Sequence, residues 1–174
     1  MDTHQINQPA KPPSAMSIWA QYQIEMGDWE QLQAAARAVR YAVFVEEQNI
    51  PVELEWDDLD EVSVHVVIFD SQLNPVATGR LLPDAHIGRL AVLAEHRQSG
   101  LGAKVLNLLI EKGRELGYPE LVLHAQTSAQ GFYQRYGFEA FGQTFIEAGI
   151  EHQSMRLVLA EHHIEPVNHF INER

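Results

Sequence analysis

The stretch Arg97-Gln98-Ser99-Gly100-Leu101-Gly102 has the residue types of an anion-binding turn. It lies between an apolar run at 87–92, expected to be a strand, and an amphipathic segment at 103–116, expected to be a helix. Where a strand turns into a helix, unpaired backbone N–H groups and the positive end of the helix dipole point toward one place. Glycine at 100 and at 102 lets an anion approach the main chain, because no Cβ stands in the way. The sequence therefore predicts a phosphate or pyrophosphate ligand at this turn.

Two common phosphate-binding loops do not match this stretch. A Walker loop needs Lys followed by Ser or Thr after its last glycine, and a dinucleotide-binding loop needs a third glycine where this chain has Val105. The R-x-x-G-x-G pattern instead resembles the acyl-CoA loop of the GNAT superfamily of N-acetyltransferases. The resemblance implies that the pyrophosphate of coenzyme A rests on this turn. An ordinary glycine-containing turn is the structural alternative.

A second motif, Phe132-Tyr133-x-x-x-Gly137-Phe138, lies further along the chain and resembles the second GNAT signature, on the helix after the fifth strand. The resemblance implies that Tyr133 is the general acid that protonates the departing thiolate. A free phenol has a pKa of about 10, so it is protonated at neutral pH and can donate. The alternative is a tyrosine that packs on the sheet with its hydroxyl at the surface.

Further motifs resemble the ElaA-like branch of the GNAT proteins, and together the resemblance spans roughly residues 18–159. Segment 43–48 also resembles the N-terminal part of acyl-homoserine lactone synthases. The motifs of the ElaA-like branch are Val43-Phe44-Val45-x-Glu47-Gln48, Pro51, Glu55-x-Asp57-x-x-Asp60, His65 and Gly149-Ile150-x-His152-x-x-Met155.

The resemblance implies an N-acetyltransferase that moves an acetyl group directly from acetyl-CoA to a primary amine, without a metal. It also implies that the fourth strand splays and offers its main chain to the pantetheine arm. Two rivals stay open: a non-catalytic acyl-CoA-binding or regulatory GNAT module, and an acyltransferase similar to the acyl-homoserine lactone synthases. The residues expected to hold the acyl-CoA are Leu90, Ala91, Val92, Arg97, Gln98, Ser99, Gly100, Leu101, Gly102, Ala103 and Phe132.

Histidine is the expected general base, because a free imidazole has a pKa of about 6.5. By resemblance, His86 occupies the place on the fourth strand where several GNAT enzymes carry Glu or His. His65 is a second candidate, although its alternation with core residues also fits a hydrogen-bonded buried histidine. His124, at the end of the fifth strand, is a third. A water relay through Glu55 or Asp57 is a further option.

Segment 44–61 carries eight acidic residues and no Lys or Arg. Such runs are often solvated surface. In GNAT folds, however, the segment between the first helix and the second strand borders the acceptor pocket. The resemblance therefore also implies an acidic rim that attracts cationic amines. On this interpretation Glu47, Glu55 and Asp57 bind a positively charged small-molecule amine.

Composition narrows the class of protein. A chain of 174 residues with 45% hydrophobic residues supports one buried core. A net charge of −12 argues against a nucleic-acid partner, and no apolar run reaches the roughly 20 residues of a membrane span. The N-terminus shows no secretion signal and the chain has no cysteine, so we expect a cytoplasmic protein. His162, His163 and His169 lack supporting ligands, so no metal site is expected.

The predicted elements form an α/β (α+β) GNAT fold, a mixed six- to seven-stranded sheet with helices on both faces. Asp28 and Gln31 predict a capping box at the start of the first helix. We expect a disordered arm at 1–16, the acetyltransferase domain at 17–159 and a loose tail at 160–174. Edge strands near the C-terminus would allow two chains to pair as a homodimer. Strands are expected at 17–25, 63–69, 76–82, 87–92, 120–125, 139–145 and 153–159.

Overall fold

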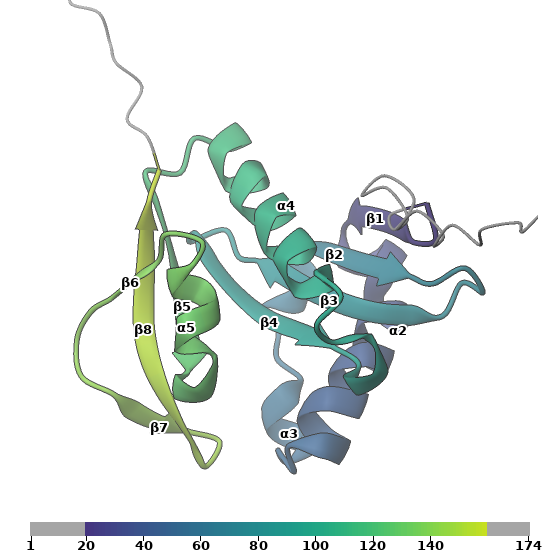
Figure 1. The fold of residues 1–174 in the computed structure, drawn as a ribbon, viewed down its shortest axis with the longest axis horizontal. Helices are drawn as coiled ribbons and strands as arrows, with labels where there is room; N and C mark the ends of the chain where they lie inside the picture. Colours follow the sequence, from purple (N-terminus) through teal and green to yellow (C-terminus); the bar gives the residue numbers. More distant parts are fainter. Residues whose placement is uncertain (1–19, 160–174) are drawn as a thin grey trace, which may run out of the picture.

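The computed structural model describes residues 20–159, so the arm expected at 1–16 and the tail expected at 160–174 lie outside the described residues. One mixed sheet runs through the domain in the order β1-β2-β3-β4-β5-β8-β6, and β7 pairs with β8 (Figure 1). The strands are β1 (Gln23–Gly27), β2 (Val64–Phe69), β3 (Pro75–Leu81), β4 (His86–Val92), β5 (Glu120–Gln126), β6 (Glu139–Ala140), β7 (Phe145–Glu147) and β8 (Ile150–Val158).

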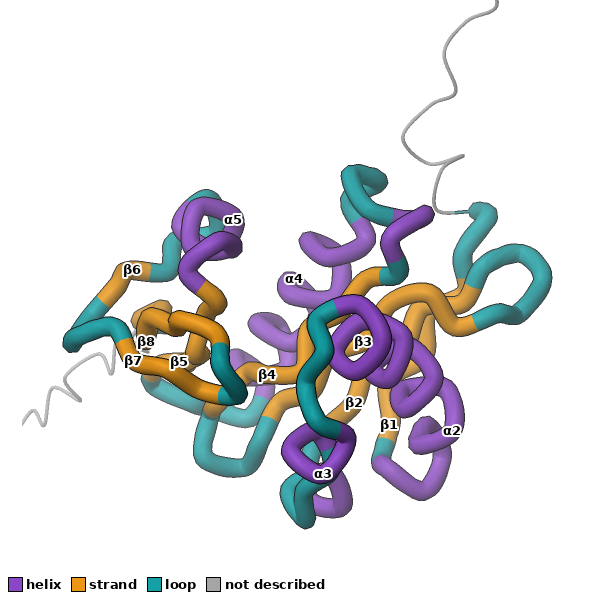
Figure 2. Tube along the Cα trace, turned by 90° about the horizontal axis from the view of Figure 1, so that it is seen from below, coloured by secondary structure: helices purple, strands orange, loops and turns teal. Residues whose placement is uncertain are grey.

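Helices cover both faces of the sheet, as the fold class predicted. α4 and α5 lie on one face, and α2 and α3 lie on the other (Figure 2). A π-helix, η1, continues directly from α2. The helices are α2 (Trp29–Arg40), η1 (Tyr41–Glu47), α3 (Val52–Glu55), α4 (Leu101–Glu115) and α5 (Gln130–Gln134), with short 3-10 turns η2 (Asp60–Val62), η3 (Ala94–His96) and η4 (Thr127–Ala129).

The sheet has eight strands, where the sequence predicted six or seven, because the segment expected as one strand at 139–145 is divided into β6 and β7. Gly142 has a φ of +71° between them, a conformation that turns the chain away from β8. The Gln153 side chain donates to the carbonyl oxygens of Phe141 and Gly142 at 2.7 and 3.2 Å. The amide group therefore takes the place of ladder partners where the strand is interrupted.

Two local signals in the sequence are confirmed at the helix termini. The Asp28 carboxylate accepts from the Gln31 main chain at 2.9 Å, and the Gln31 side chain accepts from the Asp28 main chain at 3.3 Å, which completes the capping box of α2. α4 ends before Gly117, whose φ of +77° suits the left-handed position after a helix. Both helices therefore begin or end where their own sequence dictates.

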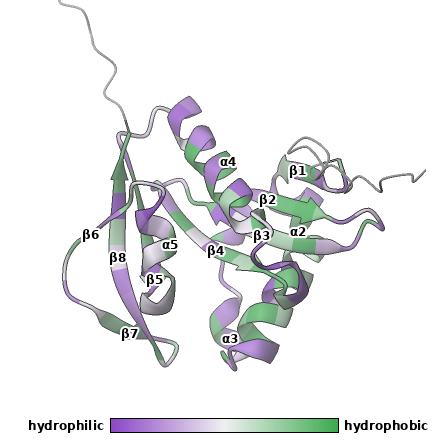
Figure 3. Cartoon of the chain, in the orientation of Figure 1, coloured by the Kyte–Doolittle hydropathy of each residue, from purple (hydrophilic) through white to green (hydrophobic). Residues whose placement is uncertain are grey.

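The main core lies between the sheet and α4. Val105, Leu106 and Leu109 of α4 are buried against β2 and β3, and the strongly hydrophobic β2, next to the edge strand β1, stands out in green (Figure 3). Gly79 of β3 makes this close approach feasible, since a Cβ there would lie 2.7 Å from the Val105 side chain. α4 is thus fixed at a short distance from β3.

β4 and β5 are paired for only a short distance. Their parallel register consists of His86↔Val122 and Ile87↔Leu123, after which the two strands diverge (Figures 1 and 2). β4 meanwhile stays paired with β3 as far as Val92, through a bulge that includes Arg89, whose φ is +51°. We refer to the diverging part, from residue 88 of β4 and residue 124 of β5 onward, as the β4–β5 fork. On the side of β4 that faces β5, main-chain groups beyond this point are not paired with a strand and can bind a ligand.

Candidate active site

The β4–α4 turn has the geometry of an anion cradle. Gln98 and Gly100 have φ of +61° and +85°, so the main chain turns sharply before the helix. Gly100 is the N-cap of α4 and provides no side-chain cap, and the first helical hydrogen bond runs from the Lys104 N–H to the Gly100 carbonyl. The N–H groups of residues 101–103 therefore precede the helical ladder and are directed out of the helix end.

The second motif lies directly against this turn. A Cβ on Gly102 would lie 3.6 Å from both Phe132 and Val92, so the end of β4, the start of α4 and α5 meet here. The Phe132 ring is 5.1 Å from the Tyr133 ring, and the Tyr133 ring is 6.1 Å from Phe138. Two motifs that are separated in the sequence thus form one region beside the β4–β5 fork.

Tyr133 sits in an apolar environment that favours its neutral form. Burial raises the pKa of Tyr133 to about 12. The phenol therefore keeps its proton throughout the neutral and moderately alkaline range, which is the state that a general acid requires.

Arg97 and Glu47, assigned from the sequence to the cofactor and to the acceptor, are bonded to each other. Arg97 donates through Nη1 and Nη2 to the two Glu47 carboxylate oxygens at 2.6 Å each, and through Nε to the Val92 carbonyl at 3.0 Å. The hydrogen bond to Arg97 lowers the pKa of Glu47. The side chains of Arg97 and Glu47 are 40% and 41% exposed. Their sequence roles stay predictions.

The acidic segment is compensated by arginines from other elements. Arg40 of α2 donates to the Glu55 carboxylate at 2.6 Å and to the Asp60 carboxylate at 2.7 Å. Arg80 of β3 bonds both Asp57 oxygens at 2.7 and 2.8 Å and shares Asp60 at 2.9 Å. These contacts tie α2, the acidic segment and β3 together.

Arg89 adds the bulge of β4 to this charged cluster. Its Nη2 donates to the Glu55 carbonyl at 3.1 Å and to Asp57 at 3.2 Å, and its Nε lies 3.2 Å from the Glu55 carboxylate. Glu55 and Asp60 are only 3% and 2% exposed, whereas the Asp57 side chain is 28% exposed. Asp57 is therefore the one acid of the cluster that a ligand can readily touch.

The side-chain pKa values in this cluster follow from burial and from the arginines. Burial raises the pKa of Asp57, but the hydrogen bonds and charge of Arg80 and the charge of Arg89 outweigh it, so the net shift is downward. At Glu55, burial outweighs the three arginines and raises the pKa. Burial also lowers the pKa of Arg89. Asp57 is thus held as a carboxylate at neutral pH.

The sequence analysis missed the partner arginines, although a signal for them was present. Arg40 lies one turn after the buried Ala36 of α2, and Arg80 lies within an otherwise buried strand. A charged side chain at a buried position requires a compensating charge. Two such arginines predict acidic partners nearby, but the sequence gives no way to decide which acids these are.

The three histidine candidates occupy different environments. His65 is 1% exposed; its Nε2 lies 2.9 Å from the Asp60 carbonyl and its ring 4.8 Å from Trp29, and burial lowers its pKa. It is a hydrogen-bonded core residue, the structural alternative that its strand position allowed. His86 lies at the start of β4, half exposed, with Nδ1 3.1 Å from the Asp84 carboxylate. His124 lies on β5, and its ring is 5.6 Å from that of His86. Partial desolvation of the ring, and then the charge of His86, lower the pKa of His124.

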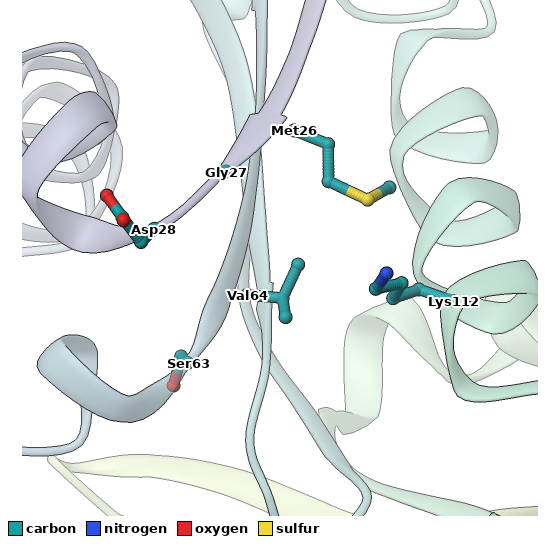
Figure 4. A pocket seen from close by; sticks show the side chains of 6 residues that line it. All are labelled: Met26, Gly27, Asp28, Ser63, Val64 and Lys112. Atoms are coloured by element: carbon teal, nitrogen blue, oxygen red, sulfur yellow. The ribbon is translucent and has the colours of Figure 1, made fainter. Parts of the chain in front are cut away.

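Two depressions mark the surface of the described residues. One lies where β1 ends and β2 begins, with Met26 and Lys112 on one side of the sheet and Asp28 and Ser63 on the other (Figure 4). It contains none of the predicted site residues. The other adjoins the β4–α4 turn and is lined by Ala42, Val43, Glu46, Glu47, Leu93, Ala94 and Glu95.

Within residues 20–159, no group of three or more His, Asp or Glu side chains is arranged to hold a metal ion. No helix in this part of the chain is long and apolar enough to cross a membrane.

Comparisons with known proteins agree with the geometry. Residues 32–159 match the acetyltransferase (GNAT) domain family. The chain is 38% identical over 121 residues to the uncharacterized N-acetyltransferase YjcF of Bacillus subtilis, a match that covers 67% of this chain and 86% of YjcF. It is similar in structure to an acyl-CoA N-acyltransferase from Pseudomonas aeruginosa (TM-score 0.70, 28% identity, 78% and 98% coverage) and to Escherichia coli ElaA (TM-score 0.69, 26% identity, 78% and 98% coverage).

The buried ion pairs predict a specific stability effect. Asp60→Asn leaves the buried Arg40 and Arg80 with one compensating charge fewer, so the free energy of unfolding should fall by about 3 kcal/mol. Urea denaturation measures this change. Asp58→Asn, at an exposed neighbouring acid, is the matched control and should change stability by less than about 0.5 kcal/mol. Equal effects of the two substitutions would show that Asp60 does not compensate the buried charges of Arg40 and Arg80.

Tyr133 should titrate unlike an ordinary tyrosine. Its pKa of about 12 lies above the free value of about 10, so the phenol stays protonated as the pH rises through the free value. The ultraviolet absorbance of phenolate, compared between the unaltered chain and Tyr133→Phe, follows this group alone. A difference signal that already develops at the free value would contradict the raised pKa of Tyr133.

Proposed function

Since this chain belongs to the GNAT acetyltransferase family and is an N-acetyltransferase, we propose that it moves an acetyl group from acetyl-CoA directly to a primary amine. The observation that carries the proposal is the uncapped N-terminus of α4, which opens beside the β4–β5 fork and against Phe132, whose ring lies 5.1 Å from that of Tyr133. An anion cradle, a free strand edge and a protonated phenol are the three parts that this reaction needs.

In this proposal the main chain holds the acyl-CoA. N–H groups of residues 98–103 bind the pyrophosphate, because those of 101–103 are directed out of the helix end and glycine at 100 and 102 keeps side chains away. The free side of β4 at 90–92 offers donors and acceptors to the pantetheine arm. Phe132 packs at Gly102 and closes the apolar side of the site.

The chemistry requires two proton movements. The neutral amine attacks the thioester carbonyl, so an N–C bond forms and the C–S bond breaks. Tyr133 donates its proton to the departing sulfur, and its raised pKa means that the phenol still carries that proton when the C–S bond breaks. The acceptor ammonium must lose a proton before attack, and a second nitrogen proton leaves as the amide forms.

His86, paired with Asp84, is the proposed acceptor of the first of these protons, and the second restores the Tyr133 phenol after it has protonated the sulfur. It lies four residues before Leu90 on β4, which corresponds to roughly 13 Å along a strand. Direct proton transfer needs about 3 Å, so His86 acts through water molecules. Asp57, which is partly exposed and held as a carboxylate, is suited to binding the acceptor ammonium rather than to carrying its proton.

The proposed acceptor is a cationic small-molecule amine. Asp57 supplies the direct contact, and the exposed acids Glu46, Glu53, Asp58 and Glu61 supply the field that steers a cation toward η1 and α3. Glu55 contributes only through the charged cluster, because it is buried. An acceptor with two or more positive charges fits this surface better than a neutral amine.

Replacing Tyr133 tests the general acid. Tyr133→Phe should lower kcat by about 100-fold or more, because proton transfer to sulfur is lost, while the Kd of CoA changes little because the turn is untouched. A thiol-release assay and calorimetry measure the two quantities. Tyr136→Phe, whose ring is 5.3 Å from Phe132, is the control. Unchanged turnover in Tyr133→Phe would show that Tyr133 is not the general acid.

A screen of amines with thiol release as the readout tests the acceptor class. Polyamines and other polycationic amines should have the lowest KM, and that KM should rise with ionic strength because screening weakens the steering field. Neutral amines of similar size are the control. CoA binding without transfer to any amine would favour a non-catalytic module. Preference for a long-chain donor would favour an acyltransferase similar to the acyl-homoserine lactone synthases.

A further inference from the structure

We infer that Glu47 and Gln48, at the end of η1, form a brace across the mouth of the β4–β5 fork and act as positioning residues for the acyl-CoA. Glu47 is bonded to the turn that follows β4, and Gln48 is bonded to the last residue of β5. One dipeptide thus holds both strands at the point where they are furthest from their shared register. The inference rests on the proposed acyl-CoA site in the fork.

The first arm of the brace is the ion pair between Glu47 and Arg97. Three nitrogens of the Arg97 guanidinium are engaged, two by the Glu47 carboxylate at 2.6 Å each and one by the carbonyl of Val92, the last residue of β4. A bidentate pair of this kind fixes orientation as well as distance. Arg97 is therefore directed toward η1 and β4, and the pyrophosphate is left to the main-chain N–H groups of the turn.

The second arm reaches β5. The Gln126 Nε2 donates to the Gln48 Oε1 at 2.8 Å, and this contact is partly buried. Gln126 ends β5, and its main chain is paired with His152 of β8. Gln48 therefore bonds a strand end that is itself fixed to the rest of the sheet. The contact can thus hold η1 at a defined distance from β5.

η1 can serve both arms because it is anchored on β4. Val43 and Phe44 are buried in a small cluster with Ala91 of β4, which holds η1 in place. The Gln48 N–H donates to the Val43 carbonyl at 3.0 Å, five residues back, as in a π-helix. Consecutive helical residues point in different directions, so the two side chains reach different strands. π-helical turns occur frequently at functional sites.

The brace sets the width of the fork before any ligand arrives. Without it, the ends of β4 and β5 lose the hydrogen bonds that join them through η1, while their short register and their neighbours in the sheet remain. A fork of fixed width lowers the ordering cost of binding the pantetheine arm. Loss of either arm should therefore weaken acyl-CoA binding and raise the KM of acetyl-CoA, while kcat changes little.

The first experiment measures the Kd of CoA by calorimetry for the full chain. Glu47→Gln should weaken CoA binding about fivefold, the loss expected for one well-formed exposed ion pair. Glu95→Gln removes an equal charge from an exposed residue two positions before Arg97 and should leave the Kd within about twofold. Tighter binding by Glu47→Gln would mean that Glu47 competes with phosphate for Arg97, and this result, like an unchanged Kd, would overturn the brace.

Double variants test whether the partners act together. Arg97→Gln combined with Glu47→Gln should bind CoA no more weakly than Arg97→Gln alone, and Gln48→Ala with Gln126→Ala should show the same non-additivity. Thermal unfolding confirms that each variant is folded, and the KM and kcat of acetyl-CoA separate positioning from general damage. Additive losses, or losses confined to kcat, would overturn the inference. Absence of CoA binding in the unaltered chain would instead overturn the proposed function.

Discussion

The parallel pairing between β4 and β5 lasts for two residue pairs, and the rest of the site depends on this short pairing. Main-chain donors and acceptors inside a protein require partners, so two strands can part only where other groups take over. The bulge at Arg89 redirects β4, Arg97 supplies a donor to the Val92 carbonyl, and η1 packs on Ala91. The uncapped end of α4 opens at the same place, which is why strand edge and anion cradle adjoin.

Charge organises the α2 and α3 face of the sheet as much as apolar packing does. Arg40, Arg80 and Arg89 join α2, β3 and β4 to the acidic segment through Glu55, Asp57 and Asp60. A buried ion-pair cluster contributes little net stability compared with apolar packing, because desolvation is costly, but breaking it is expensive. Its consequence here is geometric. The bulge residue of β4 is tied to the segment that borders the proposed acceptor site.

Most of the secondary structure could be predicted from the sequence, because capping, glycine stops and hydrophobic periodicity are local. The π-helix could not, since the same apolar spacing fits a continuation of α2 through Val43. The contacts that build the site are also non-local. Glu47 and Arg97 are 50 residues apart, and Gln48 and Gln126 are 78 residues apart. Side chains at such separations meet only because the sheet order brings their strands together.

The sequence by itself determined the turn at 97–102 and the phenol at Tyr133, because glycine conformation, helix-end N–H groups and a side chain's chemistry belong to the residues. Only the tertiary structure decided how the charges are used. A run of eight acids has the same composition whether it faces water or three arginines, and burial of Glu55 and Asp60 follows from how α2, β3 and β4 pack. The electrostatics of the site therefore depend on the fold, whereas its anion-binding turn depends on the sequence.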